Sequence, residues 1–425
     1  MNVTRLLIES TEQLIHYFQQ GEKKPDSLLI GTEHEQLLFF KDTNTRVPYE
    51  GERGIRSILE AFIAQGWKPI LEKNQPIALL SPASTHTISL EPGGQFELSG
   101  APLTTLHNSC DELANYLQQL DSILTAKNIE RIGIGFDPIS KQQDVPWMPK
   151  QRYKIMRDYM PTKGNHGLDM MTRTCTIQVN LDYVSEQDFV HKMRVAMGLQ
   201  PILSALFATS SVVEGKDSGY KSYRNFIWLD TDPDRCGLLP FVFDENMGYA
   251  RYVEYLLDIP MYYINFQGQM LVSGQSFQDF LDKKLAVLPG LPPTMVDWAH
   301  QVSMVFPEVR LKRYLELRSA DCGDDSMILA LSALWVGILY DAENLRVGHD
   351  YIRTLPFSTI HQIYNAVPKQ GLATLLQDKP IGHLARQWVE KSQEGLYRRH
   401  CLNAKGQDET IYLEPLFAIL ERQGY

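Results

Sequence analysis

Two glutamates open an apolar run in the stretch GTEHEQLLFF, residues 31–40. Glu33 and Glu35 are two positions apart, and alternate side chains of a β-strand point to the same face of a sheet. If this stretch is a strand, the two carboxylates lie roughly 7 Å apart, because each residue advances the chain by about 3.3 Å. A positive partner is needed to hold two negative charges this close together.

Three further stretches alternate between polar and apolar residues with the period of a strand. They are SLEPGGQFELSG at 89–100, TCTIQVNLDY at 174–183 and RYLELRSAD at 313–321. Their polar positions include Glu91, Glu97, Gln178, Glu316 and Arg318. For any one strand alone, the simpler interpretation is a polar face that meets water. The four stretches together pool five glutamates, amide side chains and one arginine, and this composition indicates a site.

Converging carboxylates repel each other and lose solvation, so they stay charged only when cations neutralise them. Hard divalent cations bind through oxygen ligands alone, and magnesium usually acts where nucleotide phosphates are bound. Zinc is disfavoured, because the chain has neither an H-x₃-H nor an H-E-x-x-H spacing. His34 lies on the opposite strand face from Glu33 and Glu35, and we interpret it as a structural residue. These patterns favour magnesium and ATP.

The chain has no G-x-x-x-x-G-K-[ST] element, and GIGFDP at 133–138 lacks the third glycine of a dinucleotide loop. We interpret GIGFDP as a turn after a strand. Any ATP must therefore be held through metals and arginines. Arg318 faces the same cavity as Glu316, where its guanidinium could bridge a transferring phosphoryl group. The alternative interpretation is a salt bridge between Arg318 and Glu316 or a neighbour.

Composition narrows the class of protein. The chain has 425 residues and a formal net charge of −10, which argues against a nucleic-acid partner that relies on phosphate neutralisation. Five cysteines without a C-x-x-C pair suggest a reducing compartment. No signal-peptide core is apparent at the N-terminus, and MILALSALWVGILY at 327–340 suits a buried helix better than a membrane span. We expect a cytoplasmic protein that does not contact membranes.

Helical spacing is interleaved with these strand patterns. Apolar residues between 113 and 124 follow Ser109 and Glu112 in a capping-box arrangement. A second helix is predicted to begin at Ser185, and a third, IRSILEAFIAQG, to close at Gly66. Helices and strands mixed in this way predict an α+β fold, as one large sheet structure or as two packed lobes.

The motifs, taken in order, resemble one family: glutamate-cysteine ligase (γ-glutamylcysteine synthetase) of the plant and proteobacterial type. The similar segments are GTEHE, SLEPGGQFELSGAPLTTLH, MPKQRYKIMRDYMP, GLDMMTRTCTIQVNLDY, IWLDTDPDRCGLLPFVFD, FPEVRLKRYLELRSAD and LWVGILYD. The resemblance covers about residues 28–345, and residues 346–425 carry no assigned motif. It implies a single catalytic domain over 1–425, with 346–425 as its C-terminal helical part. The implied fold is a curved antiparallel β-sheet funnel with surrounding helices, similar to the glutamine-synthetase-like carboxylate-amine ligases.

The resemblance also implies roles for individual residues. The positions that look like magnesium ligands are Glu33, Glu35, Glu91, Glu97, Gln178 and Glu316. Arg318 looks like the arginine that meets the γ-phosphate of ATP, and with Glu316 it forms the expected catalytic pair. Arg152 and Arg224 look like the arginines that bind the carboxylate of the glutamate substrate.

The activity implied is ATP-dependent ligation of the glutamate γ-carboxylate to cysteine through a γ-glutamyl phosphate. Glutamate, cysteine and ATP are then the small-molecule partners, Mg²⁺ is the cofactor, and we expect a monomer or a weak homodimer. One alternative is a related carboxylate-amine ligase that uses another amino acid or amine acceptor. A second alternative is a non-catalytic metal- or nucleotide-binding protein, which the intact carboxylate set and Arg318 disfavour.

One departure from the family concerns cysteine. Plant members are known for intramolecular disulfides that tune activity, and this chain keeps Cys110 in LHNSCDEL. The equivalent of the partner falls near Leu329, and MLVSGQSF and LAVLPGLPP, where a second pair is expected, contain no cysteine. We therefore expect Cys110 to be a free, packed thiol and the activity to be insensitive to thiol reductants.

Overall fold

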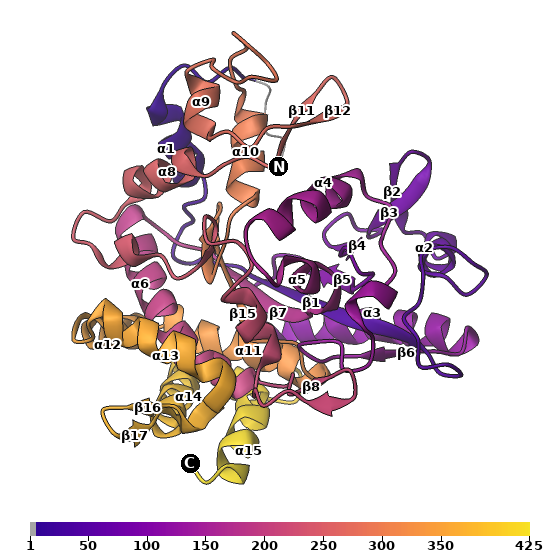
Figure 1. The fold of residues 1–425 in the computed structure, drawn as a ribbon. Coiled ribbons are helices and arrows are strands. Elements are labelled where there is room, and N and C mark those ends of the chain that lie inside the picture. Colours follow the sequence, from indigo (N-terminus) through magenta and orange to yellow (C-terminus); the bar gives the residue numbers. More distant parts are fainter. Residues whose placement is uncertain (1–5) are drawn as a thin grey trace.

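An antiparallel sheet forms the centre of the structure, a computed structural model that describes residues 6–425. The strands follow the order β14-β15-β7-β1-β5-β4-β3-β2, and β6 pairs with the second half of β1. Their bounds are β1 Ile30–Phe40, β2 Lys68–Glu72, β3 Gln75–Leu80, β4 Thr87–Leu90, β5 Phe96–Ser99, β6 Ile129–Ile132, β7 Thr176–Leu181, β14 Val309–Leu311 and β15 Leu315–Asp321. Helices lie around this sheet (Figure 1), which confirms the predicted α+β class.

Side chains alternate across the sheet as the sequence predicts. Glu33 of β1 is paired with Gln178 of β7 on one side and with Ser99 of β5 on the other, and Glu35 is paired with Glu97. Directly opposed residues in a sheet point to the same face. The polar positions of the four alternating stretches therefore share one face.

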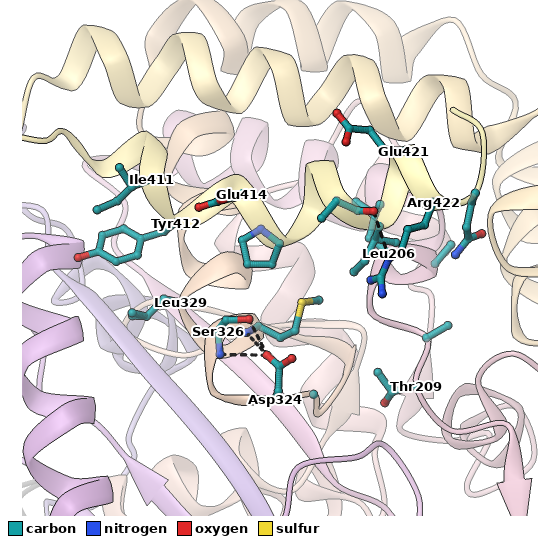
Figure 2. A pocket seen from close by; sticks show the side chains of 18 residues that line it. Leu206, Thr209, Asp324, Ser326, Leu329, Ile411, Tyr412, Glu414, Glu421 and Arg422 are labelled. Atoms are coloured by element: carbon teal, nitrogen blue, oxygen red, sulfur yellow. Dashed lines mark hydrogen bonds between the residues drawn. The ribbon is translucent and has the colours of Figure 1, made fainter.

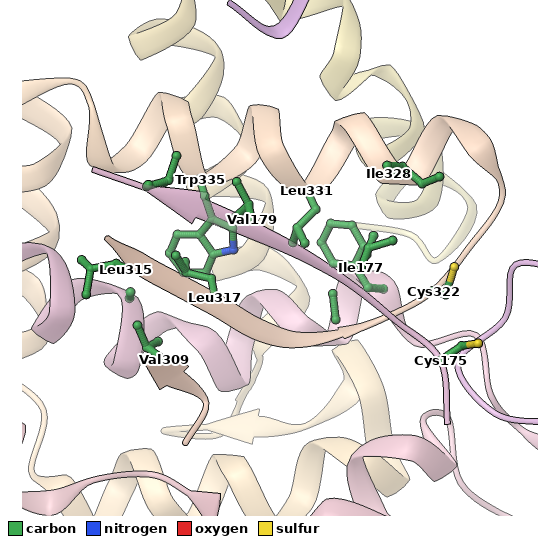
Figure 3. Packing of buried hydrophobic residues seen from close by; sticks show 14 of the residues in the cluster. Cys175, Ile177, Val179, Val309, Leu315, Leu317, Cys322, Ile328, Leu331 and Trp335 are labelled. Atoms are coloured by element: carbon green, nitrogen blue, oxygen red, sulfur yellow. The ribbon is translucent and has the colours of Figure 1, made fainter. Parts of the chain in front are cut away.

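The opposite face is apolar and is covered by α11, Asp325–Leu339. Figure 3 shows Val179 of β7 and Leu317 of β15 packed against Leu331 and Trp335 of this helix. All four side chains are almost completely removed from solvent. From its third residue onward every residue of α11 is buried, so the apolar stretch at 327–340 forms a core helix, as predicted.

Strand β15 contains a β-bulge. Its pairing with β7 shifts register between Leu317 and Ala320, so that Arg318 and Ser319 together stand opposite the single residue Gln178. A bulge bends its strand, increases the local twist and re-aims side chains, and bulges are frequent beside active sites. The one catalytic arginine predicted from the sequence therefore lies in the irregular part of the strand.

The C-terminal residues form helices, and all but the second of them pack against α11. These helices are α12 Ala342–Arg353, α13 Phe357–Gln370, α14 Ile381–Arg399 and α15 Glu414–Arg422, and they lie together in orange and yellow at the bottom of Figure 1. Glycines allow α11 and α14 to approach closely: a Cβ atom at Gly337 would lie 2.3 Å from the carbonyl oxygen of Ser392, and one at Gly395 would lie 2.1 Å from that of Gly337.

The other helices are α1 Thr11–Gln19, α2 Ile55–Ala64, α3 Leu106–Ala126, α4 Gln151–Tyr159, α5 Gly167–Arg173, α6 Glu186–Leu203, α7 Tyr223–Trp228, α8 Tyr249–Asp258, α9 Phe277–Leu281 and α10 Met295–Ser303. Ser185 caps α6 and Gly66 follows α2, as predicted. Helix α3 differs, because Thr105 rather than Ser109 is its N-cap. Glu112 accepts the N–H of Ala101 instead of closing a capping box.

The structure of residues 6–425 also bears on two other predictions, which concern membrane-spanning helices and cysteine pairing. No single helix in this range has the length and apolar character to cross a membrane, although α11 and α12 together, bent by 84°, meet those criteria by length and composition. All five cysteines are free. Cys110 is half-buried on α3, so the prediction of an unpaired thiol there is confirmed.

Candidate active site

Every site residue predicted from the sequence lines one cavity of ≈ 470 Å³ on the polar face of the sheet. The sheet supplies the carboxylates and Gln178, whereas Arg152 and Arg224 enter from α4 and α7. The residues come from segments that are up to 285 positions apart in the chain, from Glu33 to Arg318. Folding therefore brings together the set that spacing and resemblance had selected.

A larger cavity of ≈ 960 Å³ lies elsewhere, between α15 and the N-terminus of α11 (Figure 2). None of the predicted site residues lines it. Its Asp324 accepts hydrogen bonds from the N–H groups of Ser326 and Met327, which are 3.0 and 3.3 Å away, and so serves as the cap of α11. Its size alone does not make it the site of the chemistry, and we assign the candidate active site to the smaller cavity.

Three buried carboxyl groups of the smaller cavity have raised pKa values. Burial raises the pKa of Glu33 to about 7, with further contributions from the charges of Glu316 and Glu97. Burial, followed by the charges of Glu91 and Glu97, raises the pKa of Glu35 well above its usual range. The pKa of Glu97 is raised by burial and by Glu91. Without a bound cation, this side of the cavity is a place where negative charge is unfavourable.

These carboxylates accept a few hydrogen bonds from the protein. Asn180 donates to Glu33 at 2.7 Å, and the backbone N–H of Thr176 donates to Glu35 at 3.1 Å. The hydroxyl of Ser89 donates to Glu97. These contacts orient the carboxyl groups without supplying any positive charge.

Glu316 has a different environment, because three cations surround it. The Nη2 atom of Arg310 is 2.5 Å from Oε2, the Nζ atom of Lys312 is 2.8 Å from Oε1, and Nη1 of Arg318 is 2.6 Å from Oε2. Burial alone would raise the pKa of the Glu316 carboxyl, but the three cations outweigh it and hold the pKa far below its usual range. Glu316 is therefore a permanently charged group in this structure.

The bulge in β15 contains Arg318 and holds Arg224. Arg318 donates to Gln178 at 2.9 Å as well as to Glu316, which bears out the salt bridge that we considered as its alternative role. Arg224 donates through Nη1 to the carbonyl oxygen of Ser319 at 3.1 Å and through Nη2 to that of Arg318 at 2.9 Å. Its buried Nε has no hydrogen-bond partner among residues 6–425.

Arg152 approaches the cavity from α4. Its Nη2 atom is 3.9 Å from Oε1 of Glu91 and 3.2 Å from the hydroxyl of Tyr153. The Nε atom of Arg152 is buried, and within the described part of the chain it has no hydrogen-bond partner. Both arginines predicted to bind substrate thus keep an unused donor in the site, and an unpaired buried donor favours a ligand that can accept from it.

Three cations that line the cavity were not predicted from the sequence: Lys150, Arg310 and Lys312. Two of these cations could have been predicted, because the alternation of polar and apolar residues through Glu316 extends backward to Lys312 and Arg310. Lys150 has no such signal, because it precedes a helix. Its Nζ atom donates to the carbonyl oxygen of Leu90 at 2.7 Å, and burial together with Arg152 lowers its pKa to about 8.

The cavity carries charges of both signs in nearly equal number. Its carboxylates are Glu33, Glu35, Glu91, Glu97 and Glu316, and its cations are Lys150, Arg152, Arg224, Arg310, Lys312 and Arg318. The cations are not spread evenly, because three of them surround Glu316. The remaining carboxylates are consequently under-compensated.

The donor chemistry of these carboxylates fits a hard divalent cation, which binds oxygen ligands. The raised pKa values of Glu33, Glu35 and Glu97 also favour a bound cation, because they show that too little positive charge surrounds these carboxyl groups. A preformed cage is not present, since no three His, Cys, Asp or Glu side chains within residues 6–425 are arranged to hold a metal ion as they stand.

The side chains that line this cavity indicate the class of protein. Buried carboxylates, arginines with unused donors and a sheet-lined cavity of a few hundred Å³ are the features of an enzyme that handles small charged substrates. The chemistry of carboxylates and cations further favours phosphoryl transfer from a nucleotide, because catalysis of that reaction rests on positioning and charge stabilisation.

Comparison with known proteins identifies the family. Residues 29–425 match the model of glutamate-cysteine ligase family 2. The chloroplastic glutamate-cysteine ligase B of Oryza sativa subsp. japonica is 44% identical over 411 residues, which cover 96% of this chain and 81% of the relative. The chloroplastic enzyme of Arabidopsis thaliana is 45% identical over 390 residues, which cover 91% and 74%. This chain belongs to glutamate-cysteine ligase family 2, a family of ATP-dependent ligases.

A solved structure supports the fold. The glutamate-cysteine ligase of Francisella tularensis in complex with AMP superposes with a TM-score of 0.55 at 15% sequence identity, covering 94% of this chain and 82% of that one. The predicted family and the predicted carboxylate-amine ligase fold are both confirmed.

The predicted cytoplasmic location is wrong. The relatives from rice, tobacco and Arabidopsis are chloroplastic enzymes, and this comparison points to a plastid rather than the cytoplasm. Composition and cysteine pairing could not have separated the two, because both observations describe an ordinary globular protein with free thiols, whatever its compartment.

Proposed function

We propose that this chain joins the γ-carboxylate of L-glutamate to the amine of L-cysteine, with ATP converted to ADP and phosphate. The product is γ-glutamylcysteine, and the reaction is the first step of glutathione synthesis. Membership of the family supports the reaction, and the observation that carries it to this chain is the single cavity that gathers all the predicted residues.

The chemistry follows from the weakness of a carboxylate as an acyl donor. Transfer of the γ-phosphoryl group of ATP to the glutamate γ-carboxylate gives a γ-glutamyl phosphate and ADP. The cysteine amine then attacks the acyl carbon, and phosphate leaves. The second step needs a site that keeps water away and holds the amine close to the acyl phosphate, and a cavity recessed in the sheet is suited to both tasks.

Arg152 and Arg224 are the proposed anchors for glutamate. A guanidinium can bind a carboxylate through two parallel hydrogen bonds, and each of these arginines has a buried donor without a partner among the described residues. The backbone carbonyls that hold Arg224 fix its orientation. Such prior orientation reduces the entropy lost when the substrate binds.

The proposed ligands for Mg²⁺ are Glu33, Glu35, Glu91, Glu97 and Gln178, with Glu316 as a further candidate. When bound, the ion would neutralise phosphate charge and polarise the transferring group. Glu316 fits less well than the others, because both of its carboxylate oxygens already contact cations. Glu316 can join the metal shell only if Arg310 or Lys312 releases it.

Arg318 is the proposed partner of the γ-phosphate. In this structure its guanidinium bridges Glu316 and Gln178, which places it on the same face as the carboxylates. A phosphoryl group in transit carries charge over its oxygens, and a guanidinium within reach stabilises that charge. Arg318 must exchange at least one of its two contacts to do so.

We also propose that residues 1–425 act as one catalytic domain. Helices α12, α14 and α15 pack on α11, which itself covers the sheet, and α13 packs on α7, the helix of Arg224. The part of the chain without motifs thus supports the part that carries the site. The protein is proposed to act as a monomer or a weak homodimer without nucleic acid or membrane partners.

The test is release of phosphate from ATP by the purified protein with magnesium and glutamate, measured against a panel of amine acceptors. Cysteine should give the highest kcat/KM and γ-glutamylcysteine should be the product. A different amine that exceeds cysteine would favour the alternative of a related ligase. Absence of phosphate release with every amine would contradict both.

A further inference from the structure

Glu308 is a carboxylate beside the active site that none of the roles above uses. It lies immediately before β14, and its backbone carbonyl accepts the N–H of Arg318 at 3.1 Å. The hydroxyl of Tyr364 donates to its Oε1 at 2.6 Å, and the hydroxyl of Ser319 donates to Oε2. Each carboxylate oxygen of Glu308 is thus occupied by a hydroxyl group.

Glu308 is also close enough to Arg224 and Arg318 for their charges to act on it, and its own charge acts on Arg224. The hydrogen bonds of Arg224 go to backbone carbonyls and to Asn225, not to Glu308. The carboxylate and the guanidinium are therefore neighbours that do not form a salt bridge within residues 6–425.

The surroundings of Glu308 leave it poorly solvated. A cavity of ≈ 10 Å³ next to it has room for about one water molecule. Burial raises the pKa of the Glu308 carboxyl, although Tyr364 and the two arginines oppose this. A carboxylate in this position gains more from a cationic partner than one in water would, because its hydration is incomplete.

Tyr364 belongs to α13, in the C-terminal part of the chain that carries no motif. Helix α13 packs against α7, the helix of Arg224. Ser319 belongs to the bulge whose carbonyls hold Arg224. One hydroxyl from the motif-free region and one from the bulge thus meet on the same carboxylate.

From these contacts we infer that Tyr364 and Ser319 are positioning residues, which hold the Glu308 carboxylate away from Arg224 and so keep that guanidinium free for the carboxylate of the substrate. The inference deepens the proposed function and rests on the assignment of Arg224 to glutamate binding. It gives the C-terminal helices a role in substrate affinity as well as in packing.

Loss of the Tyr364 hydroxyl frees one oxygen of Glu308. The carboxylate can then rotate and pair with Arg224, where it competes with glutamate as an internal anion. The Michaelis constant for glutamate rises as a result, whereas that for ATP does not, because Arg224 is assigned to the carboxylate of glutamate and not to ATP. An uncharged amide at position 308 cannot compete in this way.

The experiment compares four proteins with matched changes: wild type, Tyr364→Phe, the double variant Tyr364→Phe/Glu308→Gln, and Tyr351→Phe. Tyr351 is the control, because it lies on the neighbouring α12 and its hydroxyl has no hydrogen bond within residues 6–425. We expect Tyr364→Phe to raise the KM for glutamate about five- to tenfold with the KM for ATP unchanged. We expect the double variant to return within about twofold of wild type and Tyr351→Phe to match wild type.

Rescue by the second substitution separates positioning from packing, since a merely structural role of Tyr364 would make the double variant as poor as the single one. Equal KM values for glutamate in the single and double variants overturn the inference, as does an unchanged KM in Tyr364→Phe. If Tyr364→Phe does not fold, Ser319→Ala with and without Glu308→Gln gives the same comparison.

A parallel measurement on Arg224→Lys tests the assignment of Arg224 to glutamate binding separately from the role of Glu308. If Arg224→Lys leaves the KM for glutamate unchanged, the assignment of Arg224 fails and the inference fails with it. If Arg224→Lys raises that KM and Tyr364→Phe does not, only the inference about Glu308 fails.

Discussion

Glu35 illustrates how stability and activity oppose each other at a single residue. Its carboxyl is buried beside Glu91 and Glu97, and burial raises its pKa well above the usual range. Removing the charge relieves repulsion, while loss of a carboxylate oxygen weakens a metal site. The residue is therefore kept for its chemistry at some cost in folding free energy.

We accordingly predict that Glu35→Gln lowers kcat about 100-fold or more, by analogy with the loss of one charge-stabilising group, and leaves the melting temperature equal to or above that of wild type. Steady-state kinetics and thermal unfolding check the two parts. Glu60→Gln, on the exposed face of α2, is the matched control and should change neither. Full activity in Glu35→Gln would remove Glu35 from the metal site.

The two substrate arginines allow a second prediction at this scale. Arg152→Lys and Arg224→Lys keep the positive charge but lose the planar pair of donors. We expect each to raise the KM for glutamate about tenfold, which corresponds to about 1.4 kcal/mol, with a much smaller effect on the KM for ATP. Arg346→Lys, exposed on α12, serves as the control. An equal rise for ATP would show that the arginines do not discriminate between the substrates.

His34 gives a prediction about pH. It is packed against Tyr116 of α3, with ring centres 5.6 Å apart, and burial lowers its pKa to about 4. Unfolded histidine titrates near 6.5, so between pH 6.5 and about 4 the unfolded chain binds a proton that the folded protein does not. Folding stability from this residue is therefore present above pH 6.5 and is lost as the pH falls toward 4, by about 3 kcal/mol in total.

The measurement is urea unfolding at pH values from 7 to 4.5 for wild type and His34→Phe. Phenylalanine preserves the ring contact and cannot titrate. The variant should lose stability less steeply with acid than wild type does, whatever its stability at pH 7. Parallel curves for the two proteins would mean that His34 accepts a proton in the folded state.

At the scale of elements, the contact between α11 and α14 depends on the absence of side chains. Alanine usually stabilises a helix interior relative to glycine by roughly 0.5–1 kcal/mol. At Gly337 we predict the opposite sign, with a loss of about 1–3 kcal/mol from overpacking, because a Cβ there would lie 2.3 Å from the carbonyl oxygen of Ser392. Chemical denaturation of Gly337→Ala checks the sign, and a gain in stability would show that the two helices can separate without cost.

The strands of the site were predictable because their pattern is local. Alternation placed Glu33, Glu35 and Glu97 on one face, and the register of the sheet agrees. The start of α3 could not be predicted, because Thr105 and Ser109 are both residue types that cap helices. Tertiary contacts determine which of the two is the N-cap. Glu112, expected in a capping box, is instead fixed by the loop at Ala101.

The bulge and the cations around Glu316 could not be predicted in the same way. A period of two predicts that Arg318 continues the face of Glu316, and it cannot show that Ser319 is an extra residue, because that fact depends on the pairing with β7. The proposed roles of Arg152 and Arg224 came only from the resemblance to a family, since a lone arginine on a helix has no distinguishing spacing.

At the scale of the whole molecule, the active-site cavity holds nearly equal numbers of positive and negative side chains, and this determines how far folding depends on magnesium. The raised pKa values of Glu33, Glu35 and Glu97 also let these groups bind protons when no metal ion is present. We therefore expect folding not to depend on magnesium. We predict that a chelator abolishes turnover but shifts the melting temperature by less than about 3 °C, with one cooperative transition before and after. Differential scanning calorimetry with and without EDTA checks this, and a large shift or a second transition would show that the ion is part of the fold.

The bulge also has a consequence for how this protein can change over generations. Leu317 and Ala320 both face the core, three positions apart, because of the extra residue between them. Deletion of Ser319 would restore an ordinary two-residue spacing, so the strand would stay paired and the core pattern would survive. One of the two carbonyl groups that anchor Arg224, that of Ser319, would be lost. We therefore expect the loss of this one codon to leave a chain that folds but binds glutamate poorly, so that the length of β15 at this position would separate active from inactive members of the family.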